Sequence, residues 1–354
     1  IMKNMGFVGL NYCNGEKYDR IHKDHPSWIL WQSESASSVN SRACYDRLND
    51  DLRDDFRLTS FDKSKVAWGD YASRAWYDVI KRDFIFGEAV WTGFDYLGEP
   101  TPYNSIERGF PYGADAPRSS YFGIVDTAGF PKDSYYFYRS QWNNTDTTTH
   151  LLPSWNDKEL GRLAKNVPLV VYTNAWAVEL IFTNPEGKKK SLGKKYMEEI
   201  KTPVGFSYKK VQGKEGHESL YMTWNIPYKK GTIEALSYDK NGKIIENTIG
   251  RREITTPAKE TFIRLDSFYK NFGNKNEKIN YITINLVDEN GQIKTDANDE
   301  ISVEVSENAE LLALDSGLQT DHSPFKVNSK KACGGRLLAI IEAIDAGPIT
   351  VKAY

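Results

Sequence analysis

The sequence has few of the residues that mark several common protein classes. Its three cysteines, Cys13, Cys44 and Cys333, stand far apart with no CxxC pair or Cys/His cluster, so neither a disulfide framework nor a zinc site is predicted. No apolar run approaches the roughly 18 residues that a membrane helix needs. Lys+Arg 46 against Asp+Glu 48 leaves a formal net charge of -2, which does not favour a nucleic-acid or membrane-surface binder. We therefore expect no metal, no nucleic-acid partner and no membrane partner.

The 354 residues are enough for two or three domains, and two kinds of domain are predicted. Most of the 9 tryptophans fall in the first 155 residues, where short apolar runs alternate with an amphipathic helical pattern at 71–84. Strands that alternate with helices predict a parallel α/β sheet over residues 1–150. A polar, proline-containing linker is expected at 151–166.

The remaining sequence changes to short alternating strands separated by turn signals such as NPEG at 184–187 and DKNG at 239–242. This spacing is typical of β-sandwiches. We expect one sandwich at 167–256 and a second at 257–354.

Two strand ends carry residues suited to carbohydrate chemistry. Glu34 follows the apolar run WILW, at the strand end where α/β barrels place catalytic residues, although a helix-capping role is the commoner use of such an acid. The stretch EAVWTGFDYLGEP offers Glu88, Trp91, Asp95 and Glu99. An indole face covers the C–H side of a sugar while a carboxylate accepts from its hydroxyls, but Trp91 could equally be core and Asp95 a turn residue.

Two other kinds of site are disfavoured. His22 and His25 have no companion ligand at a metal spacing, and Pro26 follows directly, so surface histidines are expected. No GxSxG element is present for a Ser-His-Asp hydrolase.

The order GLNY, WILWQSES, EAVWTGFDYLGEP, then RSSYFGIVDTAGFPKDSYYFYRSQW resembles the last part of the catalytic barrel of glycoside hydrolase family 2, in its bacterial β-galactosidase branch. The segments that follow resemble the sandwich domains behind that barrel. The resemblance implies a multidomain fold: the C-terminal part of a (β/α)8 TIM barrel (strands 6–8), then two immunoglobulin-like β-sandwiches. It implies a retaining exo-β-galactosidase that needs no cofactor.

The resemblance also implies roles for individual residues. Glu34 matches the nucleophile at the end of the seventh barrel strand, and Tyr12 matches the tyrosine that hydrogen-bonds and orients it. Trp91 matches the tryptophan under the galactose, and Asp95 is a further expected sugar contact. A phenol donor favours and orients a carboxylate, and an indole suits the carbon hydrogens of galactose.

The family's acid/base glutamate ends the fourth strand, whereas this chain starts near the sixth. A retaining glycosidase needs two carboxyl groups about 5 to 5.5 Å apart. We therefore expect a fragment whose partner is the missing N-terminal part of the same enzyme. Glu88 and Glu99 are disfavoured as substitutes because they belong to the eighth-strand neighbourhood.

Several alternatives stay open. β-Glucuronidases of the family carry an Asn-x-Lys pair where this chain reads ADAPRSSYFGI, which offers only Arg118 to a carboxylate. A β-mannosidase remains possible on this segment, and so does a non-catalytic carbohydrate-binding or scaffold fragment. A periplasmic or secreted location is expected from the resemblance to polysaccharide-degrading enzymes, and the oligomeric state is not predicted.

Overall fold

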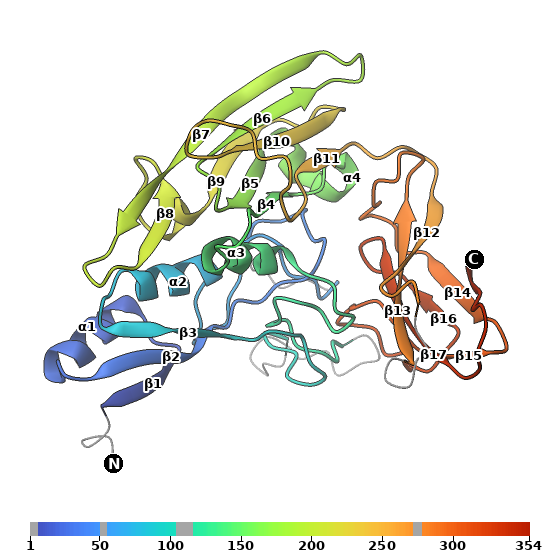
Figure 1. Ribbon diagram of the computed structural model, residues 1–354, viewed down its shortest axis with the longest axis horizontal. Helices are drawn as coiled ribbons and strands as arrows, with labels where there is room; N and C mark the ends of the chain where they lie inside the picture. The colour runs from blue at the N-terminus through green and yellow to red at the C-terminus, as the bar shows by residue number, and fades with distance from the viewer. Residues whose placement is uncertain (1–5, 50–54, 104–115, 272–277) are drawn as a thin grey trace. The chain divides into compact units, whose positions relative to one another are not determined.

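The computed structural model describes residues 6–49, 55–103, 116–271 and 278–354 (Figure 1). Contacts divide the chain into two units. The first comprises Ile1–Asp95, Tyr121–Ile124 and Pro131–Thr256, and the second comprises Tyr96–Ser120, Val125–Phe130 and Pro257–Tyr354. The predicted linker residue Trp155 is buried inside the first unit, where its indole N–H donates to the Lys229 carbonyl at 2.8 Å.

The first unit begins with a three-stranded parallel sheet in the order β1-β2-β3. Val8, Leu30 and Ile85 pair across it and form part of a buried core. The strands are β1 (Phe7–Asn11), β2 (Ile29–Ala36) and β3 (Ile85–Trp91), joined through α1 (Gly15–Asp24) and α2 (Ala72–Ile80) and followed by α3 (Asp133–Trp142).

Local sequence explains two of these helices. Asn14 caps α1, since its side chain accepts from the Lys17 N–H at 3.1 Å. Helix α2 is shorter than the predicted 71–84, and its buried residues Trp76, Val79 and Ile80 recur at helical spacing. Strand β3 ends at Trp91, and the next residue, Thr92, hydrogen-bonds to Phe122 and Ile124.

The rest of the first unit is mainly antiparallel. One sheet has the order β4-β5-β9 and the other the order β11-β10-β6-β7-β8, and apolar residues from both join one core with those of the parallel sheet. The elements are β4 (Thr149–Leu152), α4 (Asp157–Leu160), η3 (Gly161–Lys165), β5 (Val167–Thr173), β6 (Ala177–Thr183), β7 (Lys189–Lys201), β8 (Ser207–Val211), η4 (His217–Leu220), β9 (Met222–Ile226), β10 (Thr232–Tyr238) and β11 (Glu253–Thr255).

The second unit has its own core between two antiparallel sheets, in the orders β12-β13-β17-β15 and β16-β14-β18. Its strands are β12 (Phe262–Ser267), β13 (Ile279–Val287), β14 (Glu300–Val305), β15 (Ala309–Asp315), β16 (Ser329–Lys331), β17 (Arg336–Ala343) and β18 (Val351–Ala353). The chain is thus β-rich and multidomain. The TIM-barrel and immunoglobulin-like assignments and the four domain ranges stay predictions.

Candidate functional site

Tyr12 and Glu34 meet at the carboxyl ends of two adjacent parallel strands. The register of β1 and β2 shifts between Leu10 and Asn11, so that Asn11 pairs with Glu34. The Tyr12 backbone N–H donates to the Glu34 carbonyl at 2.9 Å, and the Tyr12 hydroxyl donates to Glu34 Oε2 at 2.6 Å. Both side chains are half-buried. The backbone contact holds the two residues side by side, and the phenol hydrogen bond orients the Glu34 carboxylate.

The backbone around these strand ends adopts an unusual conformation. Tyr12, Ala36 and Ser37 all have positive φ angles, of 50°, 61° and 50°. A Cβ on Gly69 would lie 2.3 Å from the Ala36 carbonyl oxygen, which accepts from the Asp70 N–H at 2.6 Å. Strained non-glycine residues persist where the surroundings enforce them, and they cluster at functional sites. The strain here marks the end of β2 as a built site.

Ser33 and Ser35, on either side of Glu34, are held by hydrogen bonds to neighbouring strands. Ser33 Oγ donates to Asn11 Oδ1 at 2.7 Å and to the Leu10 carbonyl at 3.2 Å, while Ser35 Oγ donates to Glu88 Oε2 at 2.5 Å. Sequence reasoning missed these serine contacts. They depend on register shifts in β2 and β3 that no local pattern reveals.

Trp91 ends β3, the third strand of the sheet. It pairs with Ala36, two residues beyond Glu34, and it is half-buried. The Trp91–Thr92 peptide bond is cis. The Thr92 N–H donates to the Phe122 carbonyl at 3.2 Å, and the Ile124 N–H donates back to the Thr92 carbonyl at 3.0 Å. Trp91 therefore stands at the same strand-end edge as Tyr12 and Glu34.

The Asp95 side chain is buried and paired with a lysine. Its Oδ2 is 2.6 Å from Lys132 Nζ, and both side chains are 0% exposed. Its Oδ1 accepts from the Gly123 N–H at 2.8 Å, and Lys132 also donates to the carbonyls of Asn40 and Tyr121 at 2.9 and 3.3 Å. The expected contact between Asp95 and a sugar stays a prediction. Sequence reasoning missed Lys132, and no local pattern reveals its pairing with Asp95.

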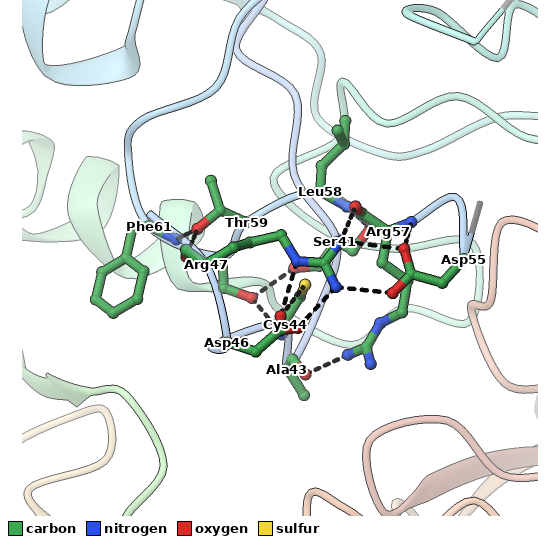
Figure 2. A network of polar contacts seen from close by, with 11 residues as sticks. Ser41, Ala43, Cys44, Asp46, Arg47, Asp55, Arg57, Leu58, Thr59 and Phe61 are labelled. Carbon is green, nitrogen blue, oxygen red and sulfur yellow. Dashed lines mark hydrogen bonds and ion pairs between the residues drawn. The ribbon is translucent and has the colours of Figure 1, made fainter. Parts of the chain in front are cut away.

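The loop after β2 is braced by a buried arginine, as Figure 2 shows. Arg47 donates through Nε to Asp46 Oδ1 at 2.8 Å, through Nη2 to Asp55 Oδ2 at 2.7 Å and through Nη1 to the Arg57 carbonyl at 3.0 Å. Burial alone would raise the pKa of Asp55, but the hydrogen bond and charge of Arg47 bring that pKa below its ordinary value. The brace fixes a long irregular segment that begins at the strained end of β2.

The remaining candidates have other partners. Tyr96 donates to Glu99, and the Arg118 guanidinium donates to the His322 carbonyl at 2.6 Å, all within the second unit. His22 and His25 stack on Phe84 and Trp28, with ring centroids 3.8 and 3.7 Å apart. Ala114 and Asp115 of the ADAPRSSYFGI segment lie outside the described residues.

Burial leaves the cysteines as packed thiols. Cys13, Cys44 and Cys333 are free and buried, and burial raises the pKa of Cys13 to about 11 and that of Cys44 to about 12. Within the described ranges, no group of three His, Cys, Asp or Glu side chains could hold a metal ion. None of the helices in those ranges is long and apolar enough to span a membrane.

Comparisons with known proteins match most of the chain. The model of the glycoside hydrolase family 2 C-terminal domain 5 matches residues 263–354, and a domain of unknown function (DUF4982) matches residues 164–246. Beta-galactosidase BoGH2A of Bacteroides ovatus is 28% identical over 347 residues, which cover 95% of this chain and 36% of that protein.

Solved structures agree in fold. A β-glycosidase from Bacteroides vulgatus superposes with a TM-score of 0.79 at 25% identity, over 99% of this chain and 44% of that one. A β-glucuronidase from glycoside hydrolase family 2 matches with a TM-score of 0.64 at 15% identity, over 100% of this chain and 32% of that one. The chain therefore spans less than half the length of the relatives that it matches.

Proposed function

We propose, from the premise that this chain belongs to glycoside hydrolase family 2, that it carries the nucleophile side of the active site of a retaining exo-β-galactosidase. The observation that carries the proposal is the 2.6 Å hydrogen bond from the Tyr12 hydroxyl to Glu34 Oε2 at two adjacent strand ends. Similarity to a protein named a β-galactosidase supports galactose as the sugar.

Glu34 attacks the anomeric carbon of a terminal β-galactose in this proposal. A new bond forms between a Glu34 oxygen and that carbon while the bond to the leaving oxygen breaks, and a water later releases the sugar with retained configuration. Tyr12 steadies the carboxylate, and the Trp91 indole packs against the carbon hydrogens of the ring.

The leaving oxygen needs a proton, and a second carboxyl group has to supply it from about 5 to 5.5 Å away. We propose that residues outside this sequence provide that acid/base. Two features support a partner segment. Strands β1 and β3 are the edges of the parallel sheet, and Phe7, Ile29 and Phe86 on the sheet are 43%, 51% and 75% exposed. Further barrel strands would pair with these edges and cover the apolar residues.

The proposed function predicts which polypeptide is active. We expect an aryl β-galactoside to be hydrolysed by the chain extended upstream to a whole barrel, and not by the 354 residues alone, because only the longer form holds both carboxyl groups. The measurement is release of the aryl alcohol, run beside the matching β-glucuronide and β-mannoside. Turnover by the short chain would contradict the missing acid/base, and a preference for another glycoside would contradict galactose.

Replacing Tyr12 by Phe in the active enzyme should lower kcat while leaving KM almost unchanged. The substitution keeps the ring but removes the charge-assisted hydrogen bond to Glu34, worth about 1.5 to 3 kcal/mol, so we expect a loss of about 10- to 100-fold. Steady-state kinetics on the same galactoside measure it. Tyr196→Phe, at an exposed position on β7, is the matched control. Equal effects of the two variants on kcat would contradict the role of Tyr12 in orienting Glu34.

A further inference from the structure

A half-buried acid that the proposed reaction does not use, Glu88, lies on β3 beside β2. Glu88 on β3 pairs in register with Gln32, and its Oε2 accepts from Ser35 Oγ at 2.5 Å. The other oxygen, Oε1, is out of contact with solvent and has no hydrogen-bond partner among the described residues. Ser35 is the residue that directly follows Glu34 in β2. Glu88 is therefore linked to the nucleophile position by one hydrogen bond and one peptide unit.

The surroundings of Glu88 disfavour a charge. Burial raises the pKa of Glu88 to about 8, and the Ser35 hydrogen bond offsets only part of that effect. Its other titratable neighbours are two phenols, Tyr18 of α1 and Tyr138 of α3, whose own pKa values are raised mainly by burial. The Tyr18 hydroxyl is also buried without a hydrogen-bond partner in the described part of the chain, and the Tyr138 hydroxyl interacts with Ser35.

Charged groups act on these two phenols. On the α2 side, Asp78 and Arg82 act on Tyr18 and pair with each other at 3.5 Å, and Asp62 acts on Tyr138. Within the described residues no lysine or arginine forms an ion pair with Glu88. A buried carboxylate without a cation is costly, whereas a carboxylic acid with a hydroxyl neighbour is not.

We infer that Glu88 is held as a neutral carboxylic acid and that, through Ser35, it is a positioning residue for the Glu34 carboxylate. The inference rests on the proposed function for the role of Glu34. The Ser35 contact anchors the peptide unit next to Glu34, just before the two strained residues Ala36 and Ser37. Neutrality keeps a second negative charge away from the nucleophile while the anchor holds the strand end in place.

Ionisation of Glu88 should therefore loosen the site at alkaline pH. An ionised Glu88 would place an unpaired charge on a carboxyl group that is shielded from solvent, which the protein relieves by moving Ser35 or by admitting solvent. The folded-state pKa of about 8 lies above the ordinary value of 4.5, so stability from the neutral acid is complete below pH 4.5 and is lost as the pH rises toward 8. The loosening of the site at alkaline pH and the loss of stability both require the Glu88 carboxyl group, so neither is expected in Glu88→Gln.

The test compares Glu88→Gln and Glu88→Ala with the wild-type enzyme that contains this chain. Infrared difference spectra of protein labelled with 13C-glutamate, wild type minus Glu88→Gln, should show a protonated carboxyl band at pH 6 that disappears around pH 8. The acid/base carboxyl group already gives the pH profile of kcat an alkaline limb, and ionisation of Glu88 near pH 8 should make that limb steeper in the wild type than in Glu88→Gln. At pH 7 Glu88→Gln should stay within about threefold of wild type.

Glu88→Ala removes the anchor itself, so we expect kcat to fall by about 10- to 100-fold at every pH with KM almost unchanged. Glu186→Gln, at an exposed hairpin turn, is the control and should leave the limb in place. An ionised Glu88 at pH 7, or an alkaline limb that is equally steep in Glu88→Gln, would overturn the inference. If the enzyme hydrolyses no glycoside, the proposed function and the positioning role both fail. The infrared band still shows, independently of activity, whether Glu88 is a neutral acid.

Discussion

Replacing Glu34 by Gln in the whole enzyme is expected to lower kcat by about 10⁴- to 10⁶-fold, the usual result of removing a nucleophile. The amide keeps the size of the side chain but cannot form the covalent bond to the anomeric carbon. Single-turnover and steady-state hydrolysis of an aryl β-galactoside measure the loss. Glu16→Gln, at an exposed position in the first turn of α1, is the control and should change neither kcat nor KM.

The stereochemistry of a rescued variant separates the nucleophile from the acid/base. In Glu34→Ala, added azide can occupy the space of the missing carboxylate and attack from the face opposite the leaving group. We therefore expect α-galactosyl azide, identified by NMR of the product. A β-configured azide would mean that Glu34 had protonated the leaving group instead. A variant that keeps more than about a tenth of wild-type kcat would remove Glu34 from the chemistry altogether.

The position of Glu34 at a strand end could be predicted because an apolar run followed by polar residues indicates the end of a buried strand. The roles of Glu34 and Tyr12 were predicted only from the family resemblance. The apolar run before Glu34 indicates a buried strand, and the structure puts its end beside Tyr12. The catalytic roles of both stay predictions. The sequence around Glu34 carries no signal for the positive φ angles of Ala36 and Ser37, which contact Gly69 and Asp70, more than 30 residues further along the chain.

The contacts that hold the site were not predictable for a physical reason. Two register shifts between β2 and β3 decide that Glu88 meets Ser35, whereas regular alternation would not reveal that pairing. Asp95 and Lys132 pair across a stretch without regular secondary structure, so their partnership is a property of the tertiary fold alone. The sequence in that region shows only an acid after an aromatic residue and a lysine before a helix.

Replacing Lys132 by Met should destabilise the first unit by about 3 to 5 kcal/mol, the cost of leaving a buried charge without its partner. Asp95 would keep its Gly123 hydrogen bond but lose the ammonium group 2.6 Å away. Adding Asp95→Asn removes the stranded charge and can retain the Gly123 bond, so the double variant should be more stable than Lys132→Met alone. Denaturant unfolding followed by tryptophan fluorescence compares the three proteins, and Lys158→Met, at an exposed position in α4, is the control.

The same pair of variants decides between two roles for Asp95. In the first role Asp95 acts only through Lys132. The pair then keeps residues 121–124 hydrogen-bonded to Thr92, which follows Trp91, so the position of Trp91 depends on it. In that case KM should rise in Lys132→Met and recover in the double variant. If Asp95 instead binds the sugar directly, the double variant should regain stability but keep a raised KM, because the carboxylate itself is gone. Its 0% exposure and fully engaged oxygens favour the first role. If the double variant regains stability but its KM stays raised, the direct contact between Asp95 and the sugar is supported instead.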